Sequence, residues 1–135
     1  MASLFPSEEW ILELMEVVNQ SGDYAKAAEK WEGDLNFIVE PGPGLPKPAC
    51  LYMDLWHGSC RSAGLFPIGE KNAEFEISAP LATWRQVLDG KLDPIMGLTT
   101  RRLKLKGNLM KILKTPKAAI ELVNCARQVD TRFPA

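Results

Sequence analysis

The sequence predicts an α+β fold, in which helices pack on one mostly antiparallel sheet. Apolar residues recur at helical spacing up to Gly33, and from Asp34 they alternate with polar ones. Beyond the alternating region, helical patterns return with one strand between them. Strands that directly follow one another pair as antiparallel hairpins, and helices at both ends of the chain then cover the sheet. A length of 135 residues fits a single domain, residues 1–135.

Two helices are predicted before the first strand. The first begins at Ser7-Glu8-Glu9, because serine caps a first turn and acidic side chains favour its positive dipole end. Ser21-Gly22 ends this helix, and Asp23 caps a second one that runs to Gly33. Apolar residues three or four apart mark the buried faces: Ile11, Leu14, Met15 and Val18, then Tyr24, Ala27, Ala28 and Trp31.

Three strands are predicted from the alternating region. The first begins at Asp34, and the Pro-Gly-Pro-Gly loop at 41–44 joins it to the second, residues 49–57, as a hairpin. Residues 58–72 are irregular and leave room for a short edge strand, and a third strand begins at Ala73. The residues sharing one face are Leu35, Phe37 and Val39, then Leu51, Met53 and Leu55, then Ala73, Phe75 and Ile77.

The C-terminal part is predicted to be helical with one strand. Pro80 opens a helix, Asp93-Pro94 begins a short helical turn that Gly97 ends, and residues 101–106 alternate as a strand. After the turn at 107–108 an apolar helix follows, and Thr115-Pro116 begins the last helix. The apolar positions are Leu81, Trp84 and Leu88, then Leu109, Ile112 and Leu113, then Ala119, Leu122, Val123, Ala126 and Val129.

Charge is divided unevenly along the chain. Residues 1–90 carry 6 Lys/Arg and 14 Asp/Glu, a net −8, whereas residues 91–135 carry 10 and 3, a net +7. One interpretation is that the two parts neutralise each other across the fold, for example with Glu74 and Glu76 facing Arg102, Lys104 and Lys106. The other is a basic face that makes transient contact with anionic lipid headgroups.

The sequence favours a cytoplasmic location. The N-terminus lacks the basic and apolar regions of a signal peptide, and the last residues do not resemble a peroxisomal Ser-Lys-Leu address. The three cysteines are an odd number without regular spacing, which indicates reduced thiols.

Reactive constellations are scarce, and no catalytic residue, metal site or cofactor is predicted. His57 and Cys60 form a His-x-x-Cys pair, with Cys50 nearby, but structural zinc takes four ligands and usually a Cys-x-x-Cys knuckle. No Gly-x-Ser-x-Gly nucleophile elbow is present, and prolines remove the N–H groups that a phosphate at 42–44 would need. The basic residues do not alternate with exposed aromatics, so no nucleic-acid partner is expected.

The stretch from Phe75 to Leu113 contains more apolar residues than a simple core requires. The helix at 109–113 is apolar on more than one face, so protein or a ligand must cover it on two sides. We therefore expect an apolar cavity with the helix from Pro116 as its lid. The predicted lining residues are Phe75, Ile77, Trp84, Leu88, Ile95, Met96, Leu98, Leu103, Leu105, Leu109, Met110 and Leu113.

Four segments in this order resemble the sterol carrier protein family (type 2, the lipid-transfer domain). They are residues 27–33 (AAEKWEG), 84–94 (WRQVLDGKLDP), 103–108 (LKLKGN) and the apolar 109–113. The resemblance implies a five-stranded sheet covered by helices. It also implies an apolar tunnel that binds fatty acyl chains, acyl-CoA or sterols.

Together these observations predict a non-catalytic carrier of an apolar small molecule such as a fatty acid, acyl-CoA or sterol-like lipid. Arg101 or Arg102 either holds an anionic group at the mouth of the cavity or is a solvated strand end. The alternative function is a dimerisation or interaction module whose apolar helices pack on a second copy or on a partner enzyme.

Overall fold

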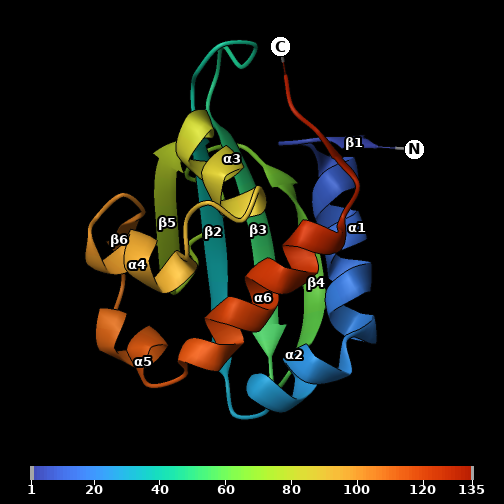
Figure 1. The fold of residues 1–135 in the computed structure, drawn as a ribbon, viewed down its shortest axis with the longest axis vertical. Coiled ribbons are helices and arrows are strands. Elements are labelled where there is room, and N and C mark those ends of the chain that lie inside the picture. Colours follow the sequence, from blue (N-terminus) through green and yellow to red (C-terminus); the bar gives the residue numbers. More distant parts are fainter. Residues whose placement is uncertain (1, 135) are drawn as a thin grey trace.

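Helices cover one face of a five-stranded sheet (Figure 1). The computed structural model describes residues 2–134, so Met1 and Ala135, the ends of the predicted domain, lie outside the described residues. The strands are β1 (Ser3–Leu4), β2 (Glu32–Glu40), β3 (Ala49–Trp56), β4 (Ser59–Phe66), β5 (Phe75–Pro80), β6 (Lys104–Lys106) and β7 (Thr131–Arg132). The helices are α1 (Glu8–Gln20), α2 (Gly22–Ala27), α3 (Leu81–Leu88), α4 (Pro94–Thr99), α5 (Leu109–Leu113) and α6 (Pro116–Gln128).

The sheet has the strand order β4-β3-β2-β5-β6. Only the central β2–β5 pair is parallel, and the other three neighbouring pairs are antiparallel. This open, mostly antiparallel sheet confirms the predicted fold class. The two ends of the chain meet in a separate short sheet, in which β1 pairs with β7.

Alternation in β2 decides what each face of the sheet contacts. Leu35 and Val39 are buried on the face that the helices cover, and Phe37 is half-buried between them. Asp34 lies on the opposite face, where its carboxylate accepts hydrogen bonds from the Tyr52 hydroxyl at 2.8 Å and the Glu74 amide at 2.7 Å. In Figure 1, α6 crosses in front of β2 and β3, while α1 lies beside the edge strand β4.

The second predicted helix is shorter in the structure than the sequence suggests. It ends at Ala27, so Trp31 lies in the following loop and Gly33 lies within β2. Its N-cap is Ser21, whose hydroxyl accepts a hydrogen bond from the Tyr24 amide, so the predicted Asp23 cap is wrong. The apolar spacing continues past the end of the helix because the Trp31 side chain is also buried, although this residue lies in the loop.

The stretch at 58–72 contains a full eight-residue edge strand, β4, rather than an irregular segment with a short strand. His57 and Gly58 both have positive φ angles, +50° and +84°, and form a tight turn from β3. The strand was hidden because its residues do not alternate: Arg61 and Ser62 are both exposed, and the apolar Leu65 faces water while Gly64 is buried. A register irregularity at Asp54–Leu55 also interrupts its pairing with β3.

Other boundaries also differ from the prediction; for example, β2 begins at Glu32 rather than Asp34 and β5 at Phe75 rather than Ala73. Gly97 lies inside α4 rather than at its end. Its lack of a side chain serves close packing instead, because a Cβ there would approach the Leu103 side chain to 2.8 Å. The last strand of the main sheet covers only Lys104–Lys106, while Arg101 turns the chain with a φ of +63°.

Lysines of the C-terminal part form ion pairs with acidic residues of the N-terminal part. Lys106 lies 3.4 Å from Glu76, its partner across β5 and β6. The other two pairs are Lys111–Glu74 at 2.7 Å and Lys104–Glu40 at 3.9 Å. These pairs support mutual neutralisation of the two parts. Within residues 2–134, no helix has both the length and the apolar character needed to cross a bilayer.

Candidate functional site

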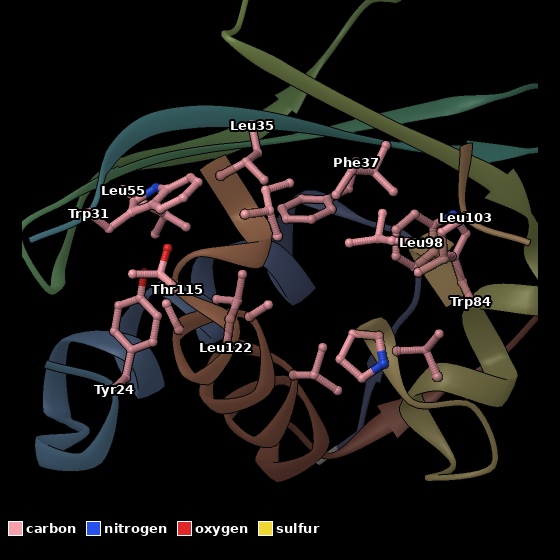
Figure 2. A pocket seen from close by; sticks show the side chains of 17 residues that line it. Tyr24, Trp31, Leu35, Phe37, Leu55, Trp84, Leu98, Leu103, Thr115 and Leu122 are labelled. Carbon is pink, nitrogen blue, oxygen red and sulfur yellow. The ribbon is translucent and has the colours of Figure 1, made fainter. Parts of the chain in front are cut away.

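An apolar pocket lies between the helix-covered face of the sheet and α6 (Figure 2). Its cavity volume is about 80 Å³. Leu35 and Phe37 of β2 line one side, and Leu122 of α6 lies across from them. Figure 2 shows Tyr24, Trp31, Leu55 and Thr115 at one end and Trp84, Leu98 and Leu103 at the other. The pocket therefore combines residues from nearly the whole length of the chain.

The side chains of α6 explain why space remains beneath it. Two neighbouring alanines, Ala118 and Ala119, face the pocket and leave room between α6 and the sheet. The end of the pocket at Trp84 is held firmly, because the Trp84 indole N–H donates a hydrogen bond to the Ile38 carbonyl at 2.9 Å. The Phe37 ring packs edge-on against Trp84 with ring centroids 5.9 Å apart.

The polar groups of the pocket are few and neutral. Tyr24 is 1% exposed, and burial raises the pKa of its phenol, so the hydroxyl stays protonated. Thr115 donates a hydrogen bond to the Lys111 carbonyl at 3.2 Å. Among the described lining residues there is no Lys, Arg, Asp, Glu or His. Such a lining suits an apolar molecule and provides no acid, base or nucleophile of ordinary reactivity.

Four of the predicted lining residues, Ile77, Trp84, Leu98 and Leu103, do line this pocket. Leu88 lines a second, neighbouring apolar cavity instead. Whether any of them contacts a ligand stays a prediction.

The other predicted lining residues lie elsewhere. Phe75 is fully buried against Trp31, with ring centroids 5.4 Å apart, and therefore belongs to the packed core. Met96 and Met110 point outward from short helices and are 57% and 59% exposed. Four more of the predicted lining residues are half-buried but do not line this pocket: Ile95, Leu105, Leu109 and Leu113. The apolar stretch from Phe75 to Leu113 supplies only part of the pocket wall, and counting its apolar residues did not give the direction of each side chain.

Sequence reasoning missed most of the pocket wall, 13 of its 17 described lining residues, notably Leu35 and Phe37 on the sheet and Leu122 and Val123 on α6. A signal was present, because the β2 alternation and the α6 stripe had both marked these residues as inward-facing. The α6 helix covers the pocket as the predicted lid would.

The histidine and cysteines do not form a metal site. No group of three or more His, Cys, Asp or Glu residues within 2–134 is arranged to hold a metal ion. The exposed His57 ring contacts the Glu32 carboxylate at 2.6 Å and the Glu29 carbonyl at 2.9 Å. Burial raises the pKa of the Cys50 and Cys60 thiols to about 11, so both are neutral and poorly nucleophilic near pH 7.

Arg101 and Arg102 are both exposed, and neither lines the pocket. The Arg102 guanidinium donates a hydrogen bond to the Gln86 side chain.

Comparison with known proteins identifies the family. Residues 12–119 match the SCP-2 sterol transfer family. The chain belongs to this family. A structure described as sterol carrier protein 2 is 43% identical to this SCP-2 domain, covers 91% of this chain and 97% of its own, and has a TM-score of 0.85.

A second structure also supports the assignment. A conserved hypothetical protein from Thermus thermophilus, named as a candidate sterol carrier protein, is 41% identical to the SCP-2 domain. The match covers 93% of this chain and 90% of that one, with a TM-score of 0.85. Apo sterol carrier protein 2 from Yarrowia lipolytica, 21% identical over 89% and 88% of the two chains, shares the fold with a TM-score of 0.57. No curated protein matches the chain.

Proposed function

We propose that the whole chain, residues 1–135, is one lipid-binding domain that carries an apolar ligand without catalysing a reaction on it. The ligand classes that suit the pocket are a fatty acid, the acyl part of acyl-CoA, or a sterol-like lipid. The observation that carries this proposal is the cavity between the sheet and α6, whose described lining is almost entirely apolar. Membership of the SCP-2 sterol transfer family supports it.

The pocket must widen to hold such a ligand. A cavity of roughly 150 Å³ holds one benzene molecule, and the volume here is about 80 Å³. The α6 helix is the element suited to move, because its contacts with the pocket come from apolar side chains. Near its C-terminal end the Arg127 guanidinium donates a hydrogen bond to the Val87 carbonyl at 3.0 Å, which anchors that end. The N-terminal end of α6, around Ala118 and Ala119, is then the part that moves outward.

The energetics allow tight binding without an ion pair. Burial contributes ~0.8 kcal/mol per CH₂, so a chain of about 16 carbons gains on the order of 10 kcal/mol before ordering costs. A ligand head group that enters the pocket must be neutral, because no described lining residue compensates a buried charge. The hydroxyls of Tyr24 and Thr115, at one end of Figure 2, are the groups available to bind it. A charged head group is expected to stay outside in water.

Titration with a fluorescent fatty acid tests the proposal directly. We expect saturable binding with a Kd in the micromolar range or below, competed by unlabelled fatty acids and fatty alcohols. Solvent extraction of the purified protein followed by mass spectrometry should identify the natural ligand. Absence of saturable binding at micromolar protein concentration would contradict the carrier function.

The exposed methionines favour one alternative function. Met96 on α4 and Met110 on α5 place large apolar side chains in water, as an interaction surface would. In that alternative the apolar helices pack on a second copy or on a partner enzyme. Size-exclusion chromatography separates the two functions: a monomer with co-purifying lipid supports the carrier, and a dimer indifferent to added fatty acid supports the interaction module.

We also infer a cytoplasmic setting with at most transient contact with membrane surfaces. The three cysteines are free and buried in the structure, which suits a reducing compartment.

A further inference from the structure

A second apolar cavity, of about 60 Å³, lies beyond the first one. Its far wall comes from the N-terminal segment and α1, including Phe5, Trp10 and Leu14. Leu88 of α3 and Ala126 of α6 complete it near the C-terminal end of α6. Like the first cavity, it is lined by apolar side chains throughout its described wall.

The two cavities share one partition. Five side chains line both of them and therefore stand between them: Phe37, Trp84, Val87, Leu122 and Val123. β2, α3 and α6 each contribute to this partition, so displacement of its side chains would join the two spaces. The joined space would continue along α6 from the Tyr24 end towards the N-terminal segment.

The partition has fixed and adjustable members. Trp84 is fixed by its hydrogen bond to the Ile38 carbonyl, and Val87 is 2% exposed. Leu122 and Phe37 are half-buried, so they have more freedom to change rotamer. Val123 is stiff at χ1 because it is β-branched. Leu122 also lies on α6, the element expected to move when a ligand enters.

The far end of the second cavity is closed by an aromatic wall. Phe5 packs edge-on against Trp10, with ring centroids 4.7 Å apart. The Trp10 indole N–H donates a hydrogen bond to the Thr131 hydroxyl at 2.8 Å, which ties this wall to the C-terminal strand β7. A ligand chain that passes Leu122 therefore meets a fixed stop.

We propose that the second cavity is a subsite for the far end of an unbranched alkyl chain, and that Leu122 and Phe37 form the gate to it. This inference rests on the proposed carrier function. Short chains then fill only the first cavity, whereas longer chains displace Leu122 and extend to the Phe5–Trp10 wall. The gate and the wall together set which chain lengths bind well.

The test measures the Kd of saturated fatty alcohols from about 10 to about 18 carbons for Leu122→Ala and for the unmodified domain. The change in Kd along the series gives the gain in binding free energy per added CH₂. Opening the gate should improve binding of the long alcohols over the short ones by about tenfold. Ile120→Ala is the matched control, because Ile120 lies two residues away on α6 and lines neither cavity. A second variant, Ala126→Leu, fills the far cavity and should weaken binding of the long alcohols only. This variant still tests the subsite if Leu122→Ala does not fold.

The outcomes separate the two proposals. If the unmodified domain binds no alcohol or fatty acid, the carrier function itself is wrong and the subsite falls with it. If the unmodified domain binds, but Leu122→Ala and Ala126→Leu keep the chain-length profile of Ile120→Ala, the gate and subsite are wrong and the carrier function stands.

Discussion

Phe75→Ala is expected to lower the free energy of unfolding by about 3–5 kcal/mol, the range for removing a fully buried phenylalanine. The ring is 0% exposed and packs against Trp31. Two glycines make room for it: a Cβ at Gly107 would lie 2.7 Å from the ring, and one at Gly33 would lie 3.1 Å from it. Backbone from both sides of β5 is therefore fitted to this ring, and little can collapse into the space it leaves.

Urea unfolding followed by tryptophan fluorescence measures this loss. Met96→Ala is the control, because Met96 is 57% exposed and its removal should change stability by less than about 0.5 kcal/mol. If Phe75→Ala unfolds at nearly the same urea concentration as Met96→Ala, the assignment of Phe75 to the packed core is wrong. The prediction from the sequence that Phe75 lines a ligand cavity would then regain support.

Phe75 and Met96 show which features of the site can be predicted from the sequence and which cannot. Alternation at Phe75 and Ile77 correctly predicted a half-buried strand, and the pattern along β2 and β3 predicted the hairpin and the buried face. Alternation indicates which face of the strand a side chain is on. It does not indicate whether that side chain packs against other residues or borders a cavity. Phe75 and Ile77 share a face of β5, yet only Ile77 borders the empty space.

Short helices were the least predictable part of the site. In a helix of five or six residues, such as α4 or α5, too few positions exist for periodicity to reveal the inward direction. Met96 and Met110 were therefore predicted to line the cavity because they are apolar, although both face water. The 13-residue α6 carries a clear stripe, and its Leu122 and Val123 do border the cavity.

The position of the cavity depends on tertiary packing that no local pattern encodes. Tyr24 and Thr115 are 91 residues apart (115 − 24) but lie at the same end of the pocket. Their meeting requires α6 to cross the sheet and reach α2, which follows from how the helices share the available apolar face. The family resemblance implied a sheet covered by helices with an apolar tunnel, and composition alone indicated only an apolar enclosure; neither predicted the meeting of α6 and α2.

Ala119→Phe is expected to weaken ligand binding by about a hundredfold or more, because the new ring would occupy the space between α6 and β2. Ala119 lines the pocket, and the cavity beneath it has a volume of about 80 Å³, comparable to the added side chain. The ring enters existing space, so the stability cost should stay at or below the 1–3 kcal/mol typical of overpacking. Titration with a fluorescent fatty acid measures the loss.

The neighbouring substitution Ile120→Phe separates blocking of the pocket from a general effect on α6. Ile120 is 37% exposed and lines neither cavity, so an aromatic ring there should leave the affinity unchanged within about twofold. Circular dichroism and thermal unfolding of both variants check that α6 is still formed. Equal affinities for the folded Ala119→Phe and Ile120→Phe proteins would mean that ligand binds elsewhere, since a ligand between α6 and the sheet must compete with a ring at position 119 and not with one at position 120.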